Sequence, residues 1–317
     1  MTAGLATAGR WELLRALGAF ADSPAAARAV ASALGVGPVS DAEHTEVFVL
    51  NCPPHASVYL GPEGVLGGEG ADRVAGFWRA IGITVPAEPD HLSALLGLYA
   101  SLGEAAADAR RDTTADALAR FQAALLAEHL WPWLPSYLDA VTDLGLPSLT
   151  AWAVLTHRAL AAESAAQPPS RVLPLALRLA PAGVSTNGGL GDLIDALATP
   201  IRSGIILTRR CLALGADQAA VGHRIGERRY TLRAMLEQDP AATFRWLQAE
   251  TGRWQHRHSS RGHGDDVASW WASRADGTGR VLRDCTANAP APADLVPRRH
   301  GQIFRYRTAA DKPVPLP

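Results

Sequence analysis

Apolar side chains in this chain recur with the spacing of one face of a helix. Over one stretch they fall at i, i+3, i+4, i+7 and i+10, as Leu92, Leu95, Leu96, Tyr99 and Leu102. A helix brings residues at this spacing onto one side because it completes a turn about every 3.6 residues. Such a stripe has to be buried against other elements. We therefore expect this segment to lie in the core of an all-α fold.

The composition favours helices along the rest of the chain. Hydrophobic residues make up 48% of the 317 residues and are mostly alanine and leucine, while aromatic residues contribute only 6%. Alanine and leucine are strong helix formers, and the β-branched and aromatic residues that favour strands are scarce. A chain of this length can bury a sizeable core and has room for roughly two domains.

Several classes of protein are disfavoured by the same composition. No apolar run approaches the length that spans a bilayer, and the first residues lack a basic and then hydrophobic secretory signal, so we expect a cytoplasmic protein without membrane contact. Cys52, Cys211 and Cys285 are far apart, which indicates neither a disulfide framework nor a cysteine zinc site.

Start and stop signals divide the chain into helices. Ser23-Pro24 and Asp239-Pro240 each combine an N-cap residue with a proline suited to the first turn. We expect Asp90 to cap the long striped helix, and the helix that follows to turn Leu118, Phe121 and Leu125 inward. Residues 47–70 contain many glycines and prolines and predict a structured loop. Further helices are expected over 11–21, 24–34, 71–81, 135–165, 192–197, 208–214, 217–225 and 228–237.

We predict three regions from this pattern. Residues 1–165 form a helical domain, and 164–170 read as a linker. Residues 166–258 form an arginine-rich helical extension. Residues 259–317 are rich in Gly, Pro, Asp and Arg without periodicity, which predicts an irregular, partly disordered tail anchored by Trp270-Trp271.

The two halves of the chain differ in charge. Residues 1–150 carry 17 acidic and 8 basic side chains, whereas residues 151–317 carry 14 acidic and 22 basic ones. This asymmetry can draw the two halves together or steer a charged partner. Two independently solvated faces would give the same counts.

Several motifs occur in a characteristic order. They are Phe48-Val-Leu-Asn-Cys-Pro-Pro-His-Ala-Ser-Val-Tyr-Leu60, then Phe77-Trp78, then Glu88-Pro-Asp-His-Leu92, and later His129-Leu-Trp-Pro-Trp133. In this order and spacing, residues 10–165 resemble the TorD/DmsD/NarJ family of redox-enzyme maturation chaperones. The serine-bearing loop ending at Tyr59 departs from the Glu-Ser pair of many relatives, and the arm after Ser170 exceeds the usual family length, which leaves the client open.

The resemblance implies an all-helical bundle that acts as a chaperone and not as an enzyme. Its partner would be an apo-molybdopterin oxidoreductase of the dimethyl-sulfoxide-reductase type, bound through the catalytic subunit or its twin-arginine leader peptide. The client would be held until its molybdenum cofactor is inserted, with at most transient contact between chaperone and cofactor. The chaperone itself would need no cofactor and no metal.

The resemblance also points to client-binding residues, which are Tyr59, Phe77, Trp78, Glu88, Pro89, Asp90 and His91. Pro89 fixes the entry to the helix, Asp90 can accept its first free N–H groups, and His91 lies in the first turn. Glu88 is suited to an arginine of a leader peptide. We expect this segment to be exposed enough for a partner to touch.

The three aromatic residues would supply an apolar groove for a client peptide, with Tyr59 the most exposed of them. Each of these residues has a purely structural alternative. Asp90 can be an ordinary cap and His91 a packing residue, Glu88 can pair with an arginine of this chain, and the aromatic side chains can belong to the core.

Two other functional classes compete with a chaperone. His256, His258, His263, Asp265 and Asp266 are ligand types that zinc or nickel accepts, but they lie in a glycine-rich stretch that does not preorganise ligands.

A basic segment at residues 202–233 resembles a helix-turn-helix that presents Arg224, Arg228, Arg229 and Arg233 to phosphate. This DNA-binding regulator is the alternative function. The overall pI near 6.8 and the acidic first half disfavour nucleic acid. A glycine-rich turn at residues 187–191 is a weak candidate for a phosphate loop, and a simple hinge explains it equally well.

Overall fold

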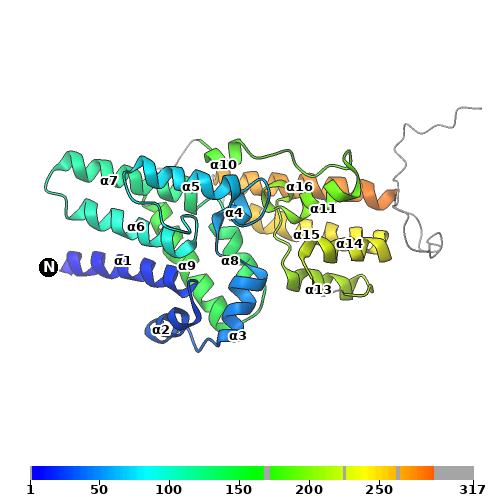
Figure 1. The fold of residues 1–317 in the computed structure, drawn as a ribbon, viewed down its shortest axis with the longest axis horizontal. Coiled ribbons are helices and arrows are strands. Elements are labelled where there is room, and N and C mark those ends of the chain that lie inside the picture. The colour runs from blue at the N-terminus through cyan, green and yellow to red at the C-terminus, as the bar shows by residue number, and fades with distance from the viewer. Residues whose placement is uncertain (1, 168–171, 224–225, 262–264, 289–317) are drawn as a thin grey trace, which may run out of the picture.

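The computed structural model describes residues 2–167, 172–223, 226–261 and 265–288. Over these residues the chain is helical and contains no β-strand (Figure 1). The all-α fold predicted from the sequence is therefore confirmed. An isolated antiparallel bridge joins His55 to His91. Among the described helices, none combines the length and the apolar character needed to cross a membrane.

The first region runs to residue 165 and holds α1 (Thr2–Phe20), α2 (Pro24–Leu34), α3 (Asp41–His44), the π-helix η1 (Thr45–Asn51), α4 (Ala56–Leu60), α5 (Gly68–Ala80), α6 (Leu92–Ala107), α7 (Asp112–Leu125), the π-helix η2 (Leu126–Leu130), α8 (Leu134–Thr142) and α9 (Pro147–Ala165). Its predicted helix starts are largely confirmed. The hydroxyl of Ser23, for example, accepts the Ala26 N–H at the start of α2.

Helix α6 lies at the centre of this region because its apolar stripe is buried. Leu92, Leu95, Leu96 and Tyr99 are all fully buried, and α6 packs against α1 and α7. The approach of α1 is close at Gly103, where a Cβ atom would lie 2.4 Å from the ring of a tryptophan in α1. A glycine is therefore required at this crossing.

Two expectations for the first region were wrong. Phe121 does not point inward, since 36% of its side chain is exposed on α7. Residues 47–70 are not a loop but carry η1, α4 and the start of α5. The glycines and prolines there end short helices without preventing them, because the apolar residues between them, such as Val47 and Tyr59, are buried in the core.

The second region holds α10 (Leu175–Arg178), α11 (Gly189–Ala198), α12 (Pro200–Ser203), α13 (Arg209–Gln218), α14 (Arg228–Gln238), α15 (Pro240–Ser259) and α16 (Asp266–Ala287). The cap predicted at Asp239 is confirmed, since its side chain accepts the Ala242 N–H. The helix predicted over 217–225 is wrong over 219–223, since only residues 217 and 218 are helical, as the end of α13. Helix α13 ends at Gln218, and Ala220 has a φ of 54°, in the left-handed region. Residues 224–225 lie outside the described residues.

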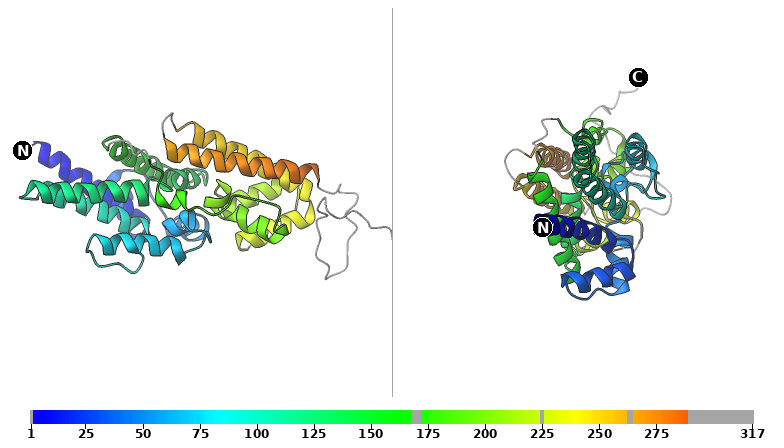
Figure 2. Two further views of the ribbon diagram at one scale, coloured as in Figure 1. Left: turned by 90° about the horizontal axis from the view of Figure 1, so that it is seen from above. Right: turned by 90° about the vertical axis from the view of Figure 1, so that its left-hand side faces the viewer.

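The irregular tail predicted from residue 259 is wrong over 266–287. Helix α16 runs beside α15 along the long axis of the molecule (Figure 2). Its sequence lacks a clear apolar stripe because small residues and one tryptophan make the contact. Ala275 and Trp271 are buried, and the Thr278 hydroxyl donates to the Ser203 carbonyl at 2.7 Å. Residues 289–317 lie outside the described residues.

One hydrophobic core runs through both regions. It includes Leu14, Leu95 and Trp152 from the first region and Leu197 and Phe244 from the second. Helix α9 ends inside the predicted linker, at Ala165, yet the buried contacts continue on both sides of that point. The division into separate domains at residue 165 stays a prediction.

Candidate functional site

Two loops meet at the motif that the sequence singles out. The Ala56 N–H donates to the Asp90 carbonyl at 3.0 Å, and the Leu92 N–H donates to the Pro54 carbonyl at 2.8 Å. These bonds flank the bridge between His55 and His91. The proline-containing loop before α4 is thus joined to the segment before α6, and we call this contact the loop junction.

Asp90 caps a helix, but not the one predicted. Its carboxylate accepts the Ser57 N–H at 2.9 Å, in the first turn of α4, and only 3% of the residue is exposed. A carboxylate there satisfies a donor that has no partner within the helix. The prediction that Asp90 caps α6 was wrong because α4 and Asp90 are 33 positions apart, beyond the reach of a local sequence pattern.

His91 provides the cap of α6 and is buried as well. Its Nδ1 accepts the Ser93 N–H at 3.1 Å and lies 2.7 Å from the Ser93 hydroxyl, and 6% of the residue is exposed. Its ring meets that of His55 edge to face at 4.7 Å. Burial lowers the pKa of His91, and the neighbouring His55 lowers it further, against the carboxylates nearby. The ring is therefore neutral near pH 7, as an acceptor at Nδ1 requires.

The exposed part of the motif is Glu88. Its side chain is 68% exposed, and its carboxylate lies 3.7 Å from His55 Nε2. No intramolecular arginine partner of Glu88 is found within the described residues. Pro89 is half-buried, and its carbonyl accepts the Trp78 indole N–H at 3.1 Å. The expectation of an exposed segment therefore holds at Glu88 and fails at Asp90 and His91.

Tyr59 is buried, not exposed as predicted. Only 2% of it reaches solvent, its ring stacks on Trp133 at 5.3 Å, and its hydroxyl donates to the Pro53 carbonyl at 3.0 Å. Burial raises its pKa well above the ordinary value. The apolar body and the one polar atom of Tyr59 are both satisfied inside the protein, so this side chain is part of the core.

Phe77 and Trp78 also contribute to packing. Trp78 is 7% exposed, while Phe77 is half-buried and meets the His129 ring at 5.0 Å. Burial, helped by Arg73, lowers the pKa of His129 to about 4. None of the three predicted aromatic residues lines either of the two cavities described below. The apolar groove predicted from them stays a prediction.

The larger cavity, of about 850 Å³, has walls from α7, η2, α9, residues 172–174 and the start of α16. We call it the alanine groove, and it is lined by Ala123, Ala124, Leu126, Ala127, Glu128, Trp131, Ala161, Ser164, Ala165, Gln167, Val172, Leu173, Pro174, Asp265, Asp266 and Val267. Sequence reasoning missed it. The only advance signal was the pair of carboxylates at 265–266, which were considered as metal ligands.

A smaller cavity of about 380 Å³ separates α8 from α13 and α15. Cys211 lies on its wall, with Sγ 3.5 Å from a carboxylate oxygen of Glu250. Burial raises the pKa of this thiol well above its ordinary value, and Glu250 raises it further. The thiol is therefore protonated near pH 7, and a protonated thiol is a poor nucleophile.

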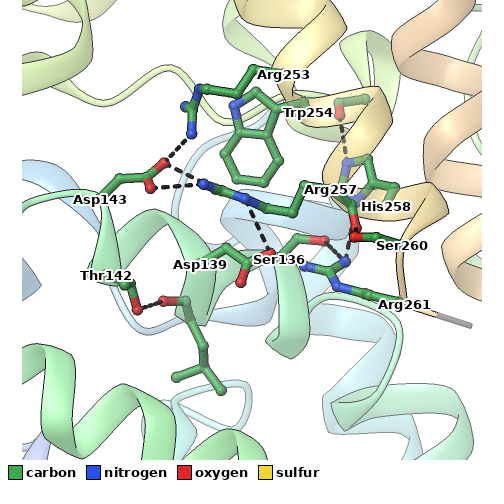
Figure 3. Close-up of polar contacts among 12 residues, drawn as sticks. Ser136, Asp139, Thr142, Asp143, Arg253, Trp254, Arg257, His258, Ser260 and Arg261 are labelled. Atoms are coloured by element: carbon green, nitrogen blue, oxygen red, sulfur yellow. Dashed lines mark hydrogen bonds and ion pairs between the residues drawn. The ribbon is translucent and has the colours of Figure 1, made fainter.

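The charge asymmetry between the halves appears as a set of ion pairs between arginines of α15 or just after it and aspartates in and at the end of α8. We call these ion pairs the interlock. Arg253 and Arg257 donate to Asp143 at 2.7 and 2.8 Å, and Arg261 donates to Asp139 and, at 3.1 Å, to the Ser136 hydroxyl (Figure 3). Arg253 and Arg257 lie four residues apart on α15 and Arg261 follows just after its end, while Asp139 lies on α8 and Asp143 is its C-cap. The two sets therefore face each other.

Burial alone would raise the pKa of Asp143, but the hydrogen bonds from the two arginines lower it below its usual value. This arginine face therefore binds the first region of the same chain.

The arginines suggested for DNA are partly used in the same way. Arg228 is half-buried and donates to the Leu207 carbonyl at 3.2 Å, and Arg229 pairs with Asp195 at 2.8 Å. Arg233 is exposed, and Arg224 lies outside the described residues. Nine positions separate α13 from α14, too many for the short turn of a helix-turn-helix. Nothing in the comparisons with known proteins supports the DNA-binding alternative.

The suggested metal ligands do not gather. His258 is buried, with Nε2 3.0 Å from the Gly204 carbonyl and Nδ1 3.1 Å from Arg261. Burial, with help from Arg261, lowers its pKa to about 3. In the part of the chain that the structure describes, no three His, Cys, Asp or Glu side chains lie together as metal ligands would. His263 lies outside that part.

Comparison with known protein families decides what the first region is. Residues 14–139 match the family model described as nitrate reductase delta subunit. The match covers less than half of the chain and shows that this part is similar to a family of redox-enzyme maturation chaperones. The family matures molybdenum-dependent enzymes, acts with their catalytic subunits, and is a chaperone family and not a catalytic one. No curated protein matches the chain.

The match spans the loop junction and, of the alanine groove, the lining residues of α7, η2 and Trp131, but not those of α9. It includes α5, α6 and the segment between them, and Asp139 but not Asp143 of the interlock. The match ends at Asp139, within α8. The arginine side of the interlock, residues 172–174 and α16 all lie beyond it.

Proposed function

We propose that this protein is a cytoplasmic chaperone for the catalytic subunit of a molybdenum-dependent oxidoreductase. It holds the subunit in its apo form until the molybdenum cofactor has been inserted, before assembly or export. The observation that carries this proposal is the family match over residues 14–139, which includes the whole Glu88-to-His91 motif.

We propose different parts in client binding for the residues of the motif, according to their burial. Asp90 and His91 are hydrogen-bonded within the chain and hold the two loops of the junction together, so we propose that they position the surface. Glu88 projects from that surface with a largely exposed carboxylate. It is the residue of the motif best placed to pair with an arginine of the client. Pro89 fixes the backbone beside it.

The finer features of the proposal rest on the family resemblance alone. They are a client of the dimethyl-sulfoxide-reductase type, binding through a twin-arginine leader peptide or the catalytic subunit itself, and transient contact with the cofactor during insertion. Tyr59, Phe77 and Trp78 then act indirectly, by supporting α4 and α5 from the core.

Deletion of the gene tests the proposal. In a strain lacking this protein, the molybdenum-dependent enzyme that it serves should accumulate with little molybdenum in its catalytic subunit, measured by elemental analysis of the purified subunit. The wild-type gene supplied on a plasmid should restore the metal content. A second molybdenum-dependent enzyme with its own chaperone serves as the control. A client with full molybdenum content in the deletion strain would overturn the proposal.

A further inference from the structure

The alanine groove is built from both regions of the chain. Helices α7 and α9 and the π-helix η2 form one side, while residues 172–174 and the start of α16 form the other. The Trp131 indole N–H donates to the Asp265 carboxylate at 3.3 Å and ties the two sides together. The Leu175 N–H donates to Glu128 at 2.7 Å and makes a second tie.

The walls of the groove are apolar and unusually small. Five of its lining residues are alanines, and the larger apolar side chains come from Leu126, Trp131, Val172, Leu173, Pro174 and Val267. Small side chains leave room that bulky side chains of another molecule can fill. A volume of about 850 Å³ is within the range of sites that enclose a ligand of several side chains' size.

The rim of the groove is acidic. Among the described residues, three carboxylates line it, from Glu128, Asp265 and Asp266, and no described lysine or arginine does so. Glu128 and Asp265 accept hydrogen bonds from neutral N–H groups, and Asp265 also lies near the positive charge of Arg261. Asp266 is exposed and makes no ion pair with any described residue. Glu128 and Asp266 therefore leave negative charge at the groove, which favours a cation.

We propose that the alanine groove binds a client segment that combines bulky apolar side chains with arginine or lysine. The apolar side chains enter between the alanines, and the cationic groups meet the acidic rim. This inference rests on the proposed function for the nature of the client. It adds a binding surface that depends on the second region, which lies beyond the family match.

Peptide binding to the full-length protein tests the site directly. The probe is a short fluorescently labelled peptide of leucine, alanine and arginine, and the matched peptide replaces each arginine with glutamate. Fluorescence anisotropy should give saturable binding of the arginine peptide, weaker by at least about tenfold for the glutamate peptide. Equal affinity for the two peptides, or no binding of either, would overturn the proposal.

Two pairs of variants place the peptide in the groove. Ala161→Trp fills the groove from α9, and Ala162→Trp puts the same side chain on the exposed neighbouring position. Asp266→Lys reverses a rim charge, and Asp284→Lys makes the same change at an exposed position farther along α16. We expect the first member of each pair to weaken binding at least about tenfold and the second to change it less than about twofold.

The surface variant Asp266→Lys keeps the test valid if Ala161→Trp fails to fold. The same variants, mixed with the apo catalytic subunit, separate this inference from the proposed function. If wild type and all four variants bind the subunit equally, the groove is not the client site although the chaperone function stands. If the wild type binds the arginine peptide but not the subunit, the proposed function fails and the peptide site remains.

Discussion

Single residues show where a local sequence pattern predicts the structure correctly and where it does not. Both caps predicted next to a proline, Ser23 and Asp239, are confirmed because a cap and its helix are neighbours in sequence. Asp90 was assigned to the wrong helix because its carboxylate accepts the N–H of Ser57, a residue 33 positions away in sequence. Tyr59 was expected at the surface because the stacking partner that buries it, Trp133, lies between η2 and α8, far along the chain.

Asp90→Ala should destabilise the fold and not only weaken client binding. It leaves the buried Ser57 N–H without an acceptor, which costs about 1–3 kcal/mol of unfolding free energy. Asp90→Asn keeps an acceptor oxygen and should recover part of that loss. Urea denaturation measures both, with the exposed Asp72→Ala on α5 as the control. An Asp90→Ala protein as stable as the wild type would contradict the assigned hydrogen bond.

At the scale of elements, apolar stripes predict helices well when one face is buried. Helix α6 follows its leucine stripe, and its burial was expected. Helix α16 was missed because small residues and Trp271 make its contacts with α15 and the first region. A helix that packs through alanine and glycine leaves little apolar periodicity to detect. The charge asymmetry suggested that the two halves of the chain could be drawn together, and in the structure the arginines of α15 face α8.

The ion pairs between α15 and α8 should contribute a measurable coupling energy. A double-mutant cycle with Asp143→Ala and Arg257→Ala should give about 0.5–1 kcal/mol, since both side chains are only about 30% exposed or less. The pair of Arg28 and Asp41 is much more exposed and serves as the control, with an expected coupling below about 0.5 kcal/mol. Equal coupling energies in the two cycles would show that the interlock stabilises the fold no more than an exposed surface ion pair does.

Acid should weaken the packing around α15 through His258. Its folded pKa is about 3 and its ordinary pKa is 6.5, so the unfolded chain binds the proton more readily. The stability that this difference provides is complete above pH 6.5 and falls as the pH drops toward 3. From pH 7 to pH 5 the loss should be about 2 kcal/mol. His258→Phe should be less stable at pH 7 but lose less on acidification. Identical pH slopes in the two proteins would refute this role.

For the whole molecule, the fold class and the first-region family followed from composition and motif order, but the shared core did not. Residues of both regions pack into one cluster, and the indole of Trp271 in α16 donates to the Pro132 carbonyl at 2.7 Å. The alanine groove escaped notice for the same reason, since its walls come from segments spread over more than 140 positions. Contacts between distant segments depend on tertiary packing, which local patterns do not encode.

The shared core predicts that the full chain unfolds as one cooperative unit. Far-ultraviolet circular dichroism, which reports helices, and tryptophan fluorescence, which reports the environment of the nine tryptophans, should give coincident urea transitions. Two separated transitions would instead support independent domains divided near residue 165.

The central claim is that the protein recognises its client before the molybdenum cofactor is inserted. Isothermal titration of the full-length chaperone with the purified catalytic subunit tests it most directly, with the subunit taken from a host that cannot make the cofactor and, in parallel, loaded with cofactor. We expect the apo subunit to bind at least about tenfold more tightly than the loaded one. Equal affinity for the two forms, or no binding of the apo subunit, would contradict the account.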